Sequence, residues 1–134
     1  MRCSLRILGA MILGLGLWTG SSAAWAMGLA EKAELQAAMQ RHVDRQSVDG
    51  AYPALDPHTG EVLHLHPVTA HPMILQMGED FVLCFDFRDG KGQDVPVDFY
   101  MTRKDGSFMV FHSAARNREM LHDFMKAGKV TRAN

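Results

Sequence analysis

Residues 81–112 read FVLCFDFRDGKGQDVPVDFYMTRKDGSFMVFH, and this stretch decides the fold. Three segments rich in apolar residues are separated by two glycine-containing turns, Gly90-Lys91-Gly92 and Asp105-Gly106. Within each segment the large apolar residues recur at every second position, which is the pattern of a strand with one buried face. Short glycine turns of this kind join antiparallel neighbours. The stretch therefore predicts a three-stranded antiparallel meander.

The two turns also fix the register of the meander. If Gly92 adopts the left-handed conformation in a three-residue loop, four apolar pairs face each other across the first two strands. These pairs are Phe87 with Val95, Phe85 with Val97, Leu83 with Phe99 and Phe81 with Met101. A two-residue turn at Asp105-Gly106 sets Met101 against Val110 and Phe99 against His112. A slip of one residue would spoil both the turn chemistry and the apolar pairing, so we expect this register.

The opposite face of the meander is only partly polar. It carries Val82, Cys84, Asp86, Tyr100, Met109 and Phe111. We expect either the C-terminal segment or a partner to cover this face.

Two helices are predicted, one on each side of the strand region. From Leu29 to about Gln46, apolar residues recur at i, i+4 and i+8, which is typical of a helix that lies against a sheet. Residues 116–126 form a shorter amphipathic segment closed by Gly128, which indicates a second helix.

A hairpin is predicted between the first helix and the meander. Residues 51–55 and 62–65 flank the turn-rich segment 56–60. Pro67 and Pro72 come next, and proline indicates an edge strand or a crossover. We therefore expect one α+β domain over residues 27–134, with an N-terminal helix packed on a bent antiparallel sheet of about five strands and a short C-terminal helix.

This order of elements resembles that of small exported cystatin-like α+β domains. The hairpin from Leu55 to Leu63, LDPHTGEVL, is also similar to the turn of PepSY domains. Both resemblances imply a fold that binds, inhibits or scaffolds, and neither implies a particular activity.

The N-terminus has the pattern of a cleavable export signal. Arg2 and Arg6 precede an apolar run of 12 residues, from Ile7 to Trp18, and Ala24-Trp25-Ala26 supplies a small-x-small cleavage motif. The run is shorter than the roughly 20 residues that span a bilayer. The alternative is an uncleaved N-terminal anchor. We expect residues 1–26 to be removed and the mature chain to be exported, to the periplasm in a Gram-negative bacterium and otherwise to the outside of the cell.

Cleavage changes the charge and the cysteine content. The mature chain has 12 basic and 15 acidic residues, a net charge of −3, which argues against nucleic-acid binding and against docking to anionic lipid. Cys84 is the only cysteine left once Cys3 is removed, so no disulfide within the mature chain is possible. The stability of the domain must therefore come from its hydrophobic core. A disulfide between two chains through Cys84 is an alternative that the sequence leaves undecided.

One group of residues suggests a metal site. His64 and His66 are two apart in a predicted strand and so point to the same face, followed by His71, Met73 and Met77. Imidazole binds copper and zinc, and thioether sulfur binds cuprous copper. We name His64, His66, His71, Met73 and Met77 as candidate ligands of copper or zinc. The alternative is that these histidines lie on a solvated edge strand and these methionines fill gaps in the core.

Two carboxylates suggest a different site. Asp86 and Asp98 are diagonal neighbours in the predicted register, at about 7–8 Å, and such a pair can do acid–base chemistry. The alternative is a structural ion pair of Asp86 with Arg88 on the same face. Cys84 would lie opposite Asp98, whose negative charge disfavours the thiolate that a nucleophilic cysteine needs.

The motifs of common enzyme and cofactor classes are absent from the sequence. We find no G-x-S-x-G, H-E-x-x-H, C-x-x-C, P-loop or dinucleotide fingerprint. The leading hypothesis is therefore an exported, non-catalytic binding or accessory module that holds a partner protein or a small ligand on its sheet and needs no cofactor. The second hypothesis is a metal-binding protein, and the third is an enzyme that uses Asp86 and Asp98.

Overall fold

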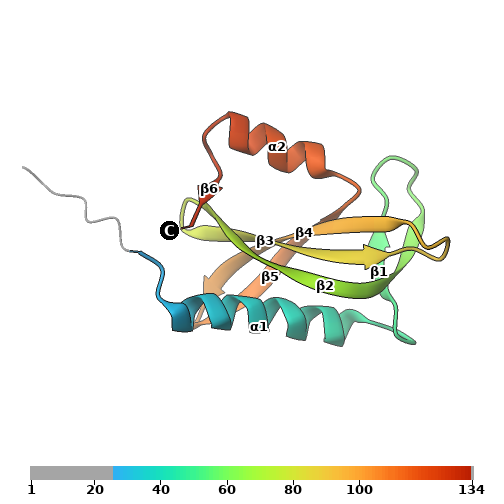
Figure 1. Cartoon of the computed structure of the whole chain (residues 1–134), viewed down its shortest axis with the longest axis horizontal. Coiled ribbons are helices and arrows are strands. Elements are labelled where there is room, and N and C mark those ends of the chain that lie inside the picture. The colour runs from blue at the N-terminus through green and yellow to red at the C-terminus, as the bar shows by residue number, and fades with distance from the viewer. Residues whose placement is uncertain (1–25, 134) are drawn as a thin grey trace, which may run out of the picture.

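The computed structural model describes residues 26–133, and Figure 1 gives their arrangement. The predicted export signal occupies residues 1–26, nearly all of which lie outside the described residues. An antiparallel sheet lies between two helices, with one helix along each of its faces (Figure 1). The predicted α+β class is confirmed.

The helices are α1 (Leu29–Gln46) and α2 (Arg118–Lys126), and the strands are β1 (Tyr52–Leu55), β2 (Val62–Met77), β3 (Asp80–Arg88), β4 (Asp94–Lys104), β5 (Ser107–Ala115) and β6 (Thr131–Arg132). The strands follow one another in the sheet in the order β1-β2-β3-β4-β5, and the short β6 pairs with β2. The first helix has its predicted bounds, and the second begins two residues later than predicted. Neither α1 nor α2 combines the length and the hydropathy that a membrane-spanning helix requires.

The predicted register of the meander is confirmed between β3 and β4. All four apolar pairs lie opposite each other, and Gly92 has a φ of 76°. Asp105 and Gly106 also have positive φ, at 51° and 76°, as the two-residue turn requires.

Between β4 and β5 the predicted register holds only for the first half of the hairpin. Met101 faces Val110 as predicted, but a bulge follows, so that His112 faces Tyr100 and Phe99 faces Ser113. The pairing of Phe99 with His112 was wrong because β5 carries one extra residue, Phe111, that has no partner on β4.

The second strand is longer than the sequence pattern indicated. We predicted a strand over residues 62–65 with an edge or crossover beyond it, whereas β2 continues through both prolines to Met77. No crossover occurs, because the same strand first pairs with β1 and then with β3. Pro67 lies beyond the last residue that pairs with β1, where β2 has a neighbour on one side only, and such an edge position is where a strand tolerates proline.

The main core fills the space between the sheet and α1. Leu35, Met39 and Val43 recur along one stripe of α1 and are fully buried. They pack with inward-facing residues of the meander, including Phe87 and Phe99. The sheet is bent so far that β1 approaches β5, and the Tyr52 hydroxyl donates a hydrogen bond to Ser113 Oγ at 3.2 Å.

A second, smaller core lies on the other face of the sheet, under α2. Leu121 from α2 packs with Val82 and Tyr100 from the sheet and with Val130 from the segment that follows α2. The C-terminal segment therefore covers part of the face that we expected to need a cover. The amphipathic pattern of this helix places Met120, Leu121, Phe124 and Met125 on one side; of these, only Leu121 is buried, and Met125 is exposed.

Candidate functional site

A cavity of about 110 Å³ lies between α2 and the face of the sheet that it covers. It is lined by His71, Met73, Leu75, Val82, Leu83, Cys84, Asp98, Arg118 and Leu121, and we call it the α2 cavity. The cavity brings together residues from β2, β3, β4 and α2, four elements that span more than 50 residues of sequence.

A bulge in β2 builds one wall of the α2 cavity. Ala70 pairs with Phe85 and Ile74 pairs with Leu83, so the three residues 71–73 stand opposite the single residue Cys84. Pro72 has no N–H to give to the ladder, which favours a bulge here. The bulge sets His71 and Met73 at the cavity that Cys84 also lines.

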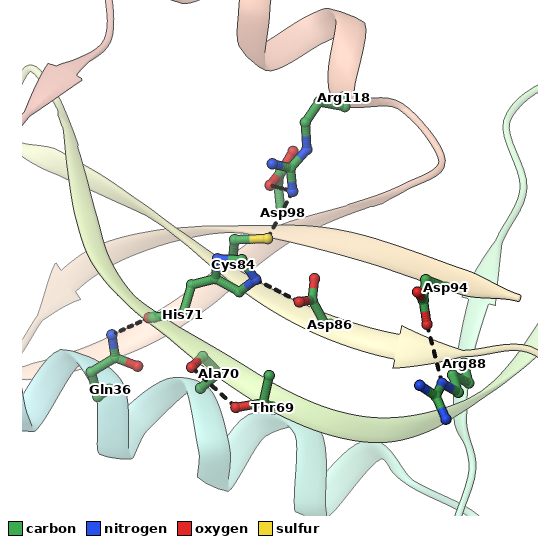
Figure 2. A network of polar contacts seen from close by, with 10 residues as sticks. All are labelled: Gln36, Thr69, Ala70, His71, Cys84, Asp86, Arg88, Asp94, Asp98 and Arg118. Atoms are coloured by element: carbon green, nitrogen blue, oxygen red, sulfur yellow. Dashed lines mark hydrogen bonds and ion pairs between the residues drawn. The ribbon is translucent and has the colours of Figure 1, made fainter.

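Cys84, Asp98 and Arg118 form a hydrogen-bonded group in the cavity (Figure 2). Cys84 on β3 and Asp98 on β4 lie directly opposite each other, as predicted. Arg118 is the first residue of α2, and its Nη2 donates to Asp98 Oδ1 at 3.0 Å and to Cys84 Sγ at 2.7 Å. Asp98 is buried, with 1% of its surface exposed. This guanidinium therefore ties the start of α2 to the centre of the sheet.

His71 and Asp86 form a second polar pair beside the first. His71 Nε2 lies 2.6 Å from Asp86 Oδ2, and both side chains are partly exposed. Gln36 on α1 donates a hydrogen bond to the backbone carbonyl of His71 at 2.8 Å, which holds the bulge in place (Figure 2).

Burial shapes the electrostatics of the α2 cavity. Burial raises the pKa of the Cys84 thiol to about 11, with Arg118 opposing the shift, so the free thiol stays protonated at neutral pH. The pKa of Asp98 is also raised, first by burial, although Arg118 pulls it down. Two buried polar atoms within the described residues have no hydrogen-bond partner, the Tyr100 hydroxyl and Arg118 Nε. An unpaired buried donor is costly, and such atoms are often satisfied by water or a ligand.

The structure separates the predicted metal-ligating residues into groups. His64 and His66 are exposed on the first part of β2, while Leu65 between them is buried, which is the predicted alternation. His71 and Met73 line the α2 cavity, and Met77 packs at the edge of the second core. In residues 26–133, the one group of three or more His, Cys, Asp or Glu ligand atoms that lie close together is His71, Cys84 and Asp86.

The two predicted carboxylates have different partners from those expected. Asp86 pairs with His71, and Arg88 pairs instead with Asp94 at 3.1 Å, so the predicted ion pair of Asp86 with Arg88 was wrong. Arg88 lies opposite Asp94 in the ladder, whereas the bulge carries His71 to Asp86. Asp98 is bound to Arg118.

Neither the role of Arg118 nor the approach of His71 to Cys84, whose ligand atoms lie within 4.8 Å of each other, was predicted from the sequence. Arg118 is 20 residues from Asp98, and no spacing rule links a residue of the last helix to one strand position. A stronger signal was available at His71-Pro72, because a proline within an apolar strand indicates a bulge.

A second, more polar cleft lies between α1, β1 and β5. It has a volume of about 230 Å³ and is lined by His42, Gln46, Tyr52, Pro53, Val110, Phe111, His112 and Ser113. His42 Nε2 lies 3.3 Å from the Tyr52 hydroxyl, which in turn donates to Ser113. His112 is exposed here, and its ring lies 5.6 Å from that of Tyr100 between ring centres, tilted by 53°.

The chain was compared with family models, with curated proteins and with solved structures, and none of them matches it.

Proposed function

We propose that this protein is an exported, non-catalytic binding or accessory module that holds a small ligand, or one side chain of a partner protein, in the α2 cavity. The observation that carries the proposal is the cavity itself, in which an apolar lining surrounds the polar group of Cys84, Asp98 and Arg118. Binding sites typically combine apolar walls with a few convergent polar atoms that orient the ligand.

The size of the cavity limits what it can hold. A water molecule occupies about 30 Å³ of liquid, so the cavity volume of about 110 Å³ corresponds to three or four waters. Sites for drug-sized ligands are larger, at about 300–1,000 Å³. A ligand of a few heavy atoms or a single inserted side chain fits these dimensions.

The polar groups in the cavity favour binding over catalysis. Asp98 is bound to Arg118, and the Cys84 thiol is protonated at neutral pH, so neither offers a free base or nucleophile. Arg118 Nε is a buried donor without an acceptor, and a ligand oxygen would satisfy it.

We expect small branched probes to bind in the α2 cavity. Isobutanol and isobutyrate share an isopropyl group and differ in the charge of their polar end, and each can be titrated into ¹⁵N-labelled protein. At least one should give saturable shifts of the Leu83, Cys84 and Leu121 amides, and Leu121→Trp should abolish them by filling the cavity. Met125→Trp, on the exposed side of the same helix, is the matched control and should bind like the parent. The proposal fails if neither probe saturates, or if Leu121→Trp binds as well as the parent.

Export is part of the same proposal and has its own test. We expect the secreted or periplasmic protein to begin at Met27, because Ala24-Trp25-Ala26 supplies the cleavage motif. Intact-mass measurement of the exported material decides the point. A mass that retains residues 1–26 would contradict cleavage and favour an uncleaved anchor.

A further inference from the structure

The bulge in β2 gathers three different metal-binding groups at the edge of the α2 cavity. One ligand atom each from His71, Cys84 and Asp86 lies within 4.8 Å of the other two. Cys84 and Asp86 are two apart on β3 and so project from the same face of the sheet, and the bulge places His71 over them (Figure 2). The three groups come from two neighbouring strands, which are more rigid supports than loops.

We propose that His71, Cys84 and Asp86 bind a divalent transition-metal ion of the Zn²⁺ type. An imidazole nitrogen, a thiolate sulfur and a carboxylate oxygen together form a ligand set that zinc accepts, whereas calcium and magnesium prefer oxygen ligands alone. This inference deepens the proposed binding function, since it names the class of ligand that occupies one end of the α2 cavity.

The distances suit such an ion after small side-chain rotations. With bond lengths of about 2.0–2.3 Å in a tetrahedral site, neighbouring ligand atoms lie roughly 3.3–3.6 Å apart. The three ligand atoms already lie within 4.8 Å of one another, and His71 Nε2 and Asp86 Oδ2 must separate from their present 2.6 Å by less than about 1 Å. The ion would take the place of the direct contact between these two atoms.

The charges of the site balance once the ion is bound. Binding of the ion releases the thiol proton of Cys84 to solvent. The resulting thiolate and the carboxylate of Asp86 together neutralise a divalent ion, and His71 binds as a neutral imidazole. The adjacent pair of Arg118 and Asp98 has no net charge. A neutral complex in a partly buried cavity avoids the desolvation cost of an uncompensated charge.

Arg118 supports the thiolate without touching the ion. Its Nη2 already donates to Cys84 Sγ, and an N–H donor of this kind stabilises a metal-bound thiolate. Gln36 holds the backbone carbonyl of His71 from α1, which orients the bulge. With three protein ligands, the fourth position is left for a water molecule from the cavity.

The test uses Co²⁺ as a coloured substitute for Zn²⁺. Mature protein titrated with Co²⁺ should bind one ion per chain and develop the near-ultraviolet charge-transfer absorption of a thiolate–cobalt bond, which Zn²⁺ should then abolish by displacement. Cys84→Ser should remove this absorption. His71→Ala or Asp86→Asn should weaken binding at least about tenfold, because the loss of even an outer-shell partner of a ligand typically costs about 10–100-fold in metal affinity. Circular dichroism melts check that each variant folds. If Cys84→Ser does not fold, the affinity of Asp86→Asn for Co²⁺ still tests the proposal.

The variant His64→Ala/His66→Ala is the matched control. Both side chains are exposed on the same strand as His71, so this change should leave the cobalt absorption and the affinity as they are. Loss of binding in this control would instead assign the metal to the His64 and His66 pair and overturn the proposal. Cobalt binding without the thiolate absorption would overturn it as well.

A copper titration separates zinc chemistry from cuprous chemistry at the same place. Met73 lines the same cavity, and thioether sulfur favours Cu(I). One outcome would overturn the assignment to a Zn²⁺-type ion. In that outcome the protein binds Cu(I) in a way that depends on Met73 and Cys84 but not on Asp86, and it does not bind Co²⁺. If the organic probes bind and Co²⁺ does not, the cavity keeps its proposed binding function and only the metal inference fails.

Discussion

Phe99→Asp should leave the domain unfolded. Phe99 is fully buried in the middle of β4 and packs against the rings of His42, Tyr52 and Phe87. The substitution buries a carboxylate without a partner, which costs several kcal/mol, and the whole stability of such a domain is about 5–15 kcal/mol. Loss of the cooperative thermal transition in circular dichroism is the expected result.

Two control substitutions separate this effect from the mere addition of a charge. Phe111→Asp changes the same residue type on β5, but Phe111 is 50% exposed and has no partner on β4, so this variant should melt close to the parent. Lys91→Asp, in the exposed loop between β3 and β4, should also fold. Phe85→Asp, on the buried face of β3, should behave like Phe99→Asp. A Phe99→Asp variant that melts like the parent would contradict the register of the meander.

The meander was predictable because two independent signals agree in it. The apolar alternation and the turn residues Gly92, Asp105 and Gly106 both specify the same pairing of β3 with β4. The bulge at Phe111 was not predictable from these signals, since an inserted residue leaves the turn and the first pairs unchanged. A bulge bends the strand that carries it, and β5 does approach β1 across the bent sheet, an arrangement that depends on tertiary packing.

The candidate site was only partly predictable for a related reason. The opposition of Cys84 and Asp98 follows directly from the register. The approach of His71 to Asp86 depends on a bulge in which three residues of β2 stand opposite one residue of β3. The alternation of apolar residues at every second position does not predict such a bulge. The predicted grouping with His64 and His66 followed the sequence spacing, whereas the structure groups His71 with residues of the next strand.

Arg118→Met should destabilise the protein in a way that depends on pH. The substitution keeps most of the apolar stem of the side chain and removes the charge that accompanies the buried Asp98 carboxylate. Breaking a buried pair from one side costs about 3–5 kcal/mol, and because Arg118 is partly exposed we expect about 2–3 kcal/mol near neutral pH. Urea denaturation of variant and parent at matched pH measures the difference in the free energy of unfolding.

The sign of the pH dependence follows from Asp98. Burial already raises its pKa, and without Arg118 the pKa rises further. A carboxyl group whose pKa is higher in the folded state stabilises that state only when protonated, so its contribution is lost as pH rises through the folded pKa. The deficit of Arg118→Met relative to the parent should therefore shrink as the pH is lowered from about 7 toward about 4, near the unfolded pKa of aspartate.

Two further variants decide whether the uncompensated charge is the cause. Arg88→Met breaks the exposed pair with Asp94 and should cost less than about 1 kcal/mol at every pH. Asp98→Leu combined with Arg118→Met removes both charges, so it should recover most of the lost stability and differ from the parent by an amount that no longer varies with pH. If the double variant is as unstable as Arg118→Met alone, the loss comes from the packing of the arginine stem under α2, and Asp98 carries no buried charge that needs Arg118.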